Sequence, residues 1–148
     1  MNLPHLIRVY QSFPPTKLED VEGEVQSQLA GCGVIVKAGS HIAIGTGSRG
    51  IANIARMVRG VVQWVRSHGG EFFIVPAMAS HGGAIAWGQR RVLERYGITE
   101  EYTGAPIRSS MNVVTLPQGG LGIALFFDEY AHHADGCVLM NCSCRPPF

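Results

Sequence analysis

Two glycine-rich loops contain the residues of this chain whose types and spacing could do chemistry. The first loop, Gly45–Gly50, contains Arg49 and has the spacing G-x-G-x-x-G. The second loop, Ala79–Gly83, contains His81 between a serine and two glycines. Glycines at such spacing let a strand turn sharply into a helix, and their bare backbone N–H groups can face an anion. Both loops therefore predict a site for a negatively charged ligand.

Arg49 and His81 have distinct predicted roles in that site. Arg49 lies where a helix is expected to begin, and a positive charge there costs stability unless an anion balances it. An arginine presents a bidentate fork that suits carboxylate or phosphate, so we expect Arg49 to bind substrate. A neutral imidazole that faces a bound anion can act as a general base, so His81 is the candidate catalytic residue. A tight turn without ligand and a surface histidine are the simpler alternatives.

The same glycine spacing also permits an NAD-type dinucleotide-binding domain. Such a domain requires an acidic residue that closes the following strand and holds the ribose hydroxyls. Glu71 has a suitable sequence separation, but it opens the strand, which closes at Pro76. The acid is therefore expected at the wrong end of the sheet. An NAD-type domain and a non-catalytic anion- or nucleotide-binding module stay open as alternatives.

The elements that must position the two loops follow from the hydrophobic pattern. Residues 41–44 and 71–75 are apolar runs that predict strands leading into the two loops. Between them, apolar residues recur at spacings of three and four from Ile51 to Val65, which predicts an amphipathic helix. Residues 41–76 therefore form a β-α-β unit with parallel strands. Because ligands bind beyond the carboxyl ends of such strands, both loops should face one cleft.

The rest of the chain predicts a single α/β domain. The fold class expected is a Rossmann-like layered sandwich with a largely parallel sheet. Further helices are predicted over 18–29 and 84–96, and a helical turn over 128–135. Further strands are predicted over 6–10, 112–116, 122–127 and 137–141, whereas 34–36 is either a strand or a linker.

The composition narrows the classes of partner. The net charge is +1, which does not favour nucleic acid or an anionic membrane. Only 16% of residues are charged, against about 25% in ordinary domains, so we expect apolar surface that another domain or a second copy of the chain covers. No secretion signal or membrane-spanning run is present in the sequence, so we expect a cytoplasmic protein with four reduced cysteines.

Three runs of the sequence resemble the N-terminal domain of the lactate racemase superfamily, the nickel-pincer enzymes. They are Gly47–Ile54, Val75–Ala84 and Gly104–Met111, and the similarity continues to about Asn141. The resemblance implies that these segments form the first part of a two-domain enzyme.

The resemblance also implies roles for individual residues. An arginine that contacts the ligand corresponds to Arg49, and a histidine that accepts or donates a proton corresponds to His81. Thr46, Gly47 and Ser48 fall where the family lines its nucleotide or substrate site. The implied activity is that of an isomerase, which racemises or epimerises a 2-hydroxy acid by hydride and proton transfer.

The sequence departs from the family pattern after Asn141. Relatives continue with a basic residue and Lys-Pro-His, then with the lysine that anchors the nickel-pincer nucleotide, a nickel-ligating histidine and a second domain. Here a divergent tail, Cys142–Phe148, follows instead. We therefore expect a truncated or frame-shifted chain without the second domain, which binds no metal and no cofactor and is inactive or partial by itself.

Overall fold

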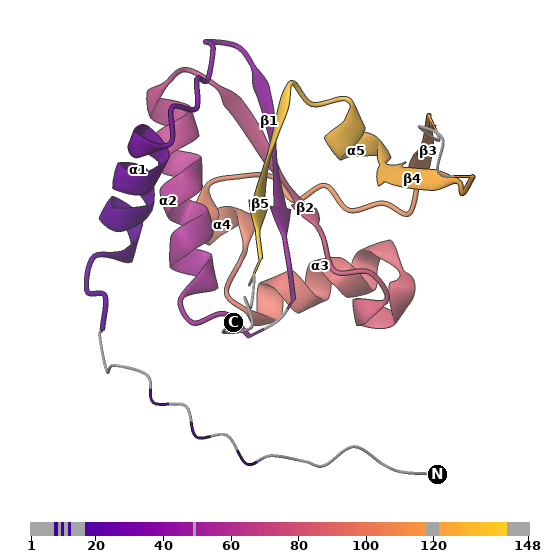
Figure 1. Cartoon of the computed structure of the whole chain (residues 1–148), viewed down its shortest axis with the longest axis horizontal. Coiled ribbons are helices and arrows are strands. Elements are labelled where there is room, and N and C mark those ends of the chain that lie inside the picture. The colour runs from indigo at the N-terminus through magenta and orange to yellow at the C-terminus, as the bar shows by residue number, and fades with distance from the viewer. Residues whose placement is uncertain are drawn as a thin grey trace.

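A three-stranded parallel sheet forms the centre of the protein (Figure 1). The computed structural model describes residues 17–48, 50–117 and 122–141, together with Arg8, Tyr10 and Ser12. The sheet has the order β2-β1-β5, where β1 is His41–Thr46, β2 is Glu71–Pro76 and β5 is Gly136–Met140. This arrangement confirms the predicted α/β fold and the parallel pairing of the first two strands.

Helix α2 (Ile54–Ser67) connects β1 to β2 and supplies much of the core. The predicted apolar face is confirmed, because its isoleucine and valines are buried against the sheet. The helix begins later than the pattern suggests, since Asn53 takes a left-handed conformation with φ 60° and Ile51 stays in the preceding loop. Trp64 is also buried, which the predicted stripe did not include.

Helix α1 (Val21–Gly31) lies beside α2 on the same face of the sheet. Its first turn is capped by Asp20, whose Oδ1 accepts a hydrogen bond from the Gly23 amide at 2.9 Å. The two helices approach closely at Gly60, where an added Cβ would lie 3.1 Å from the Glu22 carbonyl oxygen. A glycine in α2 therefore sets the position of α1.

The opposite face of the sheet carries α5 (Glu129–His132) and a two-stranded antiparallel sheet. Strands β3 (Val113–Leu116) and β4 (Leu125–Asp128) match the two strands predicted near these positions, but they do not join the parallel sheet. Ala131 of α5 packs against Phe73 and neighbouring residues of β1 and β2, which gives a second, smaller core cluster.

The segment after β2 differs most from its prediction. The helix expected over 84–96 begins two residues later, as α3 (Ala86–Arg95), because Ala84 has positive φ. A short 3-10 turn, η1 (His81–Ala84), precedes it, and Gly82 and Gly83 also have positive φ there. A short helix, α4 (Glu100–Thr103), follows and was not predicted.

The remaining predictions concern the ends of the chain and its loops. Residues 34–36 have no regular secondary structure. The predicted strand over 6–10 falls largely outside the described residues, as does the tail from Cys142. No helix in the described part of the chain is long and apolar enough to cross a membrane.

An ion pair between the two neighbouring helices makes the stability of the protein depend on pH. Arg56 of α2 lies 2.6 Å from the Glu22 carboxylate of α1 and holds the pKa of that carboxyl below its ordinary value. A lowered folded-state pKa stabilises the fold above the unfolded-state value, and this contribution is lost as pH falls through the folded-state pKa.

We expect Glu22→Gln to lower the midpoint of urea unfolding at neutral pH, and the difference from wild type to disappear in acid. A difference that persists at acidic pH would contradict this origin. Glu24→Gln, on an exposed position of the same helix, is the control.

Candidate functional site

The ends of β1 and β2 bring the two glycine-rich loops together. The two strands pair without offset, from His41 beside Glu71 to Thr46 beside Pro76, so both loops begin at the same edge of the sheet. Across the gap between the loops, Ser48 Oγ and His81 Nδ1 form a hydrogen bond. Residues from the two predicted loops therefore meet in one place, as expected from the topology.

The loop that carries His81 is held by close backbone packing against α3. A Cβ at Gly82 would lie 2.5 Å from the Gly88 carbonyl carbon, so only glycine fits this approach. Ala79 and Ala84 also have positive φ, 49° and 53°, which is uncommon for residues other than glycine. Buried Gln89 supports the loop by donating from Nε2 to the Ala79 carbonyl at 2.7 Å. Backbone conformations of this kind cluster at functional sites, where the surrounding structure maintains them.

A pocket of about 520 Å³ opens beside the Ser48–His81 pair. Besides these two residues it is lined by Gly82 and by three residues at the end of α3 and just after it: Val92, Arg95 and Tyr96. Among the described residues no carboxylate lines this pocket, whereas the Arg95 guanidinium contributes hydrogen-bond donors. The polar groups of the pocket therefore suit an anion.

Two residues of this pocket were not predicted from the sequence. Arg95 is exposed and has no hydrogen-bonding or acidic partner within the described ranges. The Tyr96 hydroxyl donates to the Ser48 carbonyl oxygen at 2.7 Å, which ties the end of α3 to the first loop. The only sequence signal for Arg95 is its spacing of four residues from Arg91 on one helix. That spacing is common on solvated helices, so it did not indicate a site.

The three residues predicted to contact a cofactor are all buried, and they differ in whether they reach the pocket. Thr46 is fully buried, and its Oγ1 donates to the Ile44 carbonyl at 3.4 Å. Gly47 is also buried, and its amide donates to the Met140 carbonyl at 3.0 Å. Ser48 is the member of the three whose side chain reaches the pocket. Arg49, the predicted ligand-binding arginine, lies outside the described residues.

The acidic residue that would hold the ribose in a dinucleotide-binding domain lies far from this pocket. Glu71 is at the amino-terminal end of β2, where its Oε2 is 3.4 Å from His41 Nδ1. The loops leave the opposite ends of the same strands. Glu71 is therefore not placed to hold a ribose at the Ser48–His81 pocket, as the sequence predicted.

Metal ligands do not gather in the part of the chain that the structure describes. No group of three or more histidine, cysteine, aspartate or glutamate side chains there could hold a metal ion. Cys32 and Cys137 are free thiols, and the other two cysteines lie in the undescribed tail.

Comparison with known proteins adds no assignment: no family model, curated protein or solved structure matches this chain.

Two adjacent glycines test the importance of the backbone packing below the pocket. Gly82→Ala adds a Cβ into the Gly88 backbone, whereas a Cβ at Gly83 meets nothing closer than 4.0 Å. Both substitutions place alanine at positive φ, which costs about 1–2 kcal/mol. We expect Gly82→Ala to destabilise the protein clearly more than Gly83→Ala in urea unfolding. Equal losses of unfolding free energy in the two variants would show that the close approach of Gly82 to Gly88 contributes nothing beyond the requirement for positive φ.

Proposed function

We propose that this chain is a lactate racemase-like domain that binds a small carboxylate, such as a 2-hydroxy acid, in the pocket beside Ser48 and His81. The observation that carries the proposal is the Ser48–His81 hydrogen bond, because it joins the two loops whose sequences resemble that family. Among the described residues, the pocket lining has no carboxylate and the Arg95 guanidinium has no hydrogen-bonding or acidic partner, and both observations support an anionic ligand.

In this proposal, Ser48 positions His81 for proton exchange with the ligand. A neutral imidazole has one N–H and one lone pair, and its partner determines which nitrogen carries the proton. If Nδ1–H donates to Ser48 Oγ, then Nε2 keeps its lone pair and can take the hydroxyl proton of a 2-hydroxy acid. Ser48 is then a positioning residue, and His81 is the catalytic one.

Hydride transfer is assigned to no residue of this chain. In the resembling family a nickel-pincer nucleotide supplies that chemistry, and the described residues hold no group of three or more side chains that could bind a metal by themselves. The proposed contribution of this chain is therefore anion binding and proton exchange. A non-catalytic anion-binding module is the second candidate, because the same pocket without a hydride acceptor would perform binding alone.

Ligand binding can be tested with two arginines of α3. Arg95 lines the pocket beside Ser48 and His81, whereas Arg91 lines only a smaller neighbouring hollow. A charge-assisted hydrogen bond contributes about 1.5–3 kcal/mol, so Arg95→Ala should weaken L-lactate or phosphate binding roughly 10- to 100-fold in calorimetric titration. We expect Arg91→Ala to bind nearly as wild type, and Arg49→Ala to lose binding without a change in the unliganded melting temperature. Equal effects of Arg91→Ala and Arg95→Ala would reject this pocket as the site.

The tautomer of His81 tests the positioning role of Ser48. At a pH where the imidazole is neutral, we expect ¹⁵N NMR to show the proton mainly on Nδ1 in the wild type. Ser48→Ala removes the acceptor, so the population should move toward the Nε2–H form that predominates in free histidine. Tyr96→Phe is the control, because it removes a hydrogen bond to the Ser48 backbone but leaves Oγ in place. An unchanged tautomer ratio in Ser48→Ala would remove Ser48 from the mechanism.

A further inference from the structure

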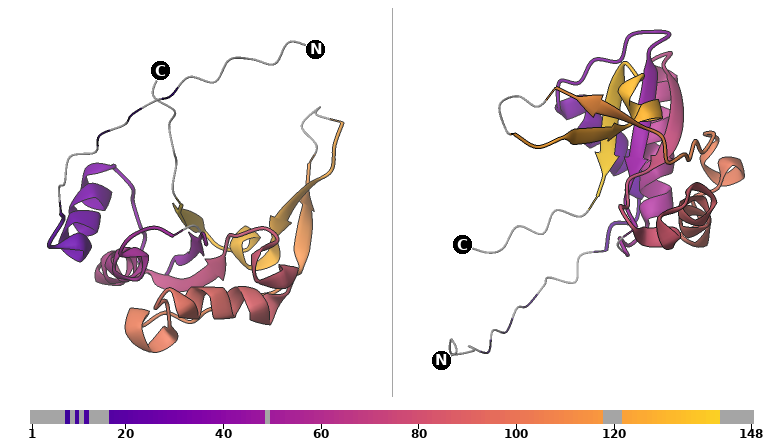
Figure 2. Two further views of the ribbon diagram at one scale, coloured as in Figure 1. Left: turned by 90° about the horizontal axis from the view of Figure 1, so that it is seen from below. Right: turned by 90° about the vertical axis from the view of Figure 1, so that its right-hand side faces the viewer.

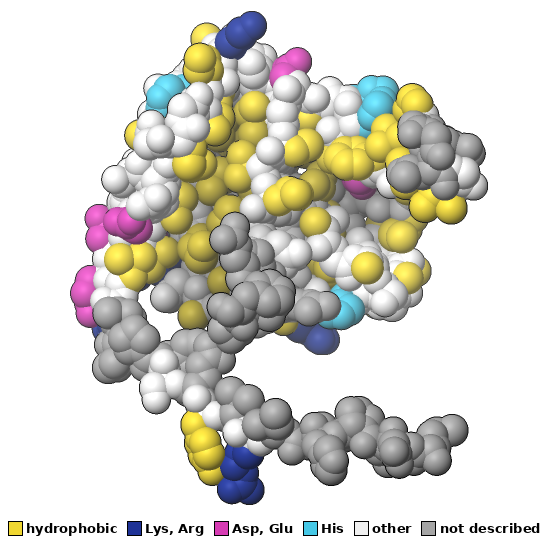
Figure 3. Space-filling view, in the orientation of Figure 1, with side chains coloured by type: hydrophobic (Ala, Val, Ile, Leu, Met, Phe, Trp, Pro, Cys, Tyr) yellow, Lys and Arg dark blue, Asp and Glu magenta, His cyan; other side chains and the backbone are white. Residues whose placement is uncertain are grey.

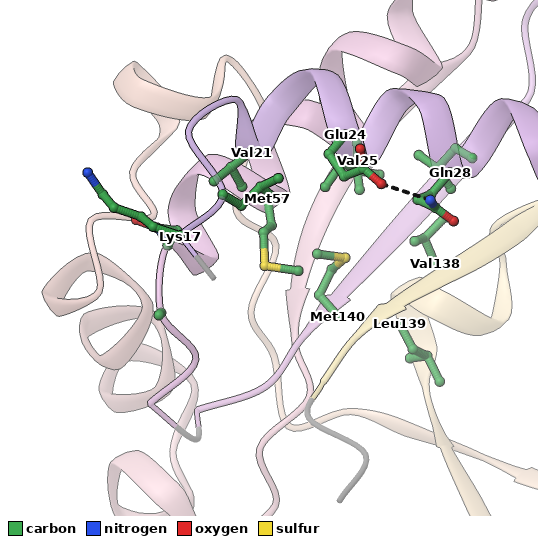
Figure 4. A pocket seen from close by; sticks show the side chains of 14 residues that line it. Lys17, Val21, Glu24, Val25, Gln28, Met57, Val138, Leu139 and Met140 are labelled. Carbon is green, nitrogen blue, oxygen red and sulfur yellow. Dashed lines mark hydrogen bonds between the residues drawn. The ribbon is translucent and has the colours of Figure 1, made fainter. Parts of the chain in front are cut away.

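A wide apolar groove shares no lining residue with the Ser48–His81 pocket. It encloses about 860 Å³ between α1, α2 and β5. Figure 4 shows Met57 of α2 and Met140 of β5 pointing toward one another into it, with Val25 of α1 and Val138 of β5 alongside. Polar side chains stand at the rim, where Gln28 Nε2 donates to Glu24 Oε1 at 2.8 Å. Figure 3 shows hydrophobic side chains gathered between α1 and β5.

The floor of the groove ends at the free edge of β5. Among the described residues, β5 pairs with β1 on one side and with no strand on the other. The Met140 carbonyl accepts from the Gly47 amide, so it faces β1. Because backbone groups alternate along a strand, those of Cys137 and Leu139 face the open edge. The Leu139 side chain is 75% exposed.

Helix α1 stands over the strand position that is vacant beside β5. It packs mainly along α2, and Figure 2 shows it displaced from α2 toward the β5 edge of the sheet. Packed helices lie about 8–10 Å apart, whereas strands lie about 4.8 Å apart, so each helix covers roughly two strand positions. Because α2 covers β1 and β2, the apolar side of α1 faces the strand position that lies beside β5 on the side away from β1.

The course of the chain specifies which segment would fill that position. Helix α1 runs antiparallel to the strands and begins at their carboxyl ends (Figure 1). A strand immediately before α1, placed beside β5, would run parallel to the sheet. The connection from this strand through α1 to β1 would cross the sheet in the same direction and over the same face as the β1-α2-β2 connection. The two connections would therefore have the same handedness.

We propose that the groove accepts a fourth parallel strand and that the chain's own segment Leu6–Tyr10 supplies it. This segment has the strand pattern noted above, and Ile7 and Val9 alternate with Arg8. With the two β-branched residues directed under α1, Arg8 faces away from the groove on the other side of the sheet. In the structure Arg8 and Tyr10 are exposed and belong to no strand, so docking is a second state of the chain.

The length of the connection permits this docked state. Lys17, at the start of the continuously described chain, already lines the groove. The seven steps from Tyr10 to Lys17 can span roughly 20 Å even when Pro14 and Pro15 restrict the path. Because the strand is covalently attached, its effective concentration at the groove is in the mM range or above, which favours it over a strand from another molecule.

Amide hydrogen exchange on the full chain tests the proposal. Docking protects the outward-facing amide of Leu139, so we expect it to exchange slowly in the wild type and about tenfold faster or more in Ile7→Asp/Val9→Asp. Arg8→Asp is the matched control, because it introduces the same residue on the face away from the groove and should leave the rate within about twofold. Slow exchange of α2 amides in every variant verifies that the fold persists.

Three results would overturn the proposal. The first is a Leu139 amide that exchanges at the unprotected rate in the wild type, and the second is an equal rate in all three proteins. The third is protection that falls on dilution, since it would identify a second copy of the chain as the occupant. As a check that does not depend on the variants, a peptide of residues 4–13 added to a chain that lacks residues 1–12 should restore Leu139 protection saturably.

Discussion

The in-register parallel pairing of β1 with β2 is the constraint on which the candidate site depends. It places the ends of the two strands level, so the loops that follow them leave the sheet side by side. A shift of the register by one residue would move Ser48 away from His81 and turn the side chains of β2 that face α2 toward the opposite side of the sheet. The valine-rich face of α2 packs in one core cluster with residues of both strands.

The pocket is built from strained backbone that its surroundings maintain. Gly82 lies against Gly88, and Ala79 and Ala84 hold left-handed conformations, while the Gln89 side chain anchors the loop from within the protein. Such an arrangement costs free energy in the folded state. A loop that only connected β2 to α3 would not need this strained backbone. The geometry and the sequence pattern therefore both favour a binding role.

The sequence predicted the β-α-β unit well because its signals are local and strong. The apolar spacing of α2 favours a helix, and the short apolar run of β2, which lies between a glycine and a proline, favours a buried strand. The sequence also predicted that the two loops lie at one edge of the sheet, where Ser48 and His81 are in contact. It missed Arg95 and Tyr96 because their roles arise from the packing of α3 against the first loop, a contact between residues 48 positions apart that no local pattern encodes. The later start of α3, after Ala84, was missed because alanine rarely adopts positive φ.

The bond between Tyr96 and Ser48 has a consequence for how the site comes apart. Three segments distant in the chain meet there: the end of β1, the loop after β2 and the end of α3. Leu93 of α3 is fully buried in the same core cluster as α2 and the sheet. Detachment of α3 would therefore dissolve the pocket and expose part of the main core at the same time, so the lifetime of the site is coupled to that of the core.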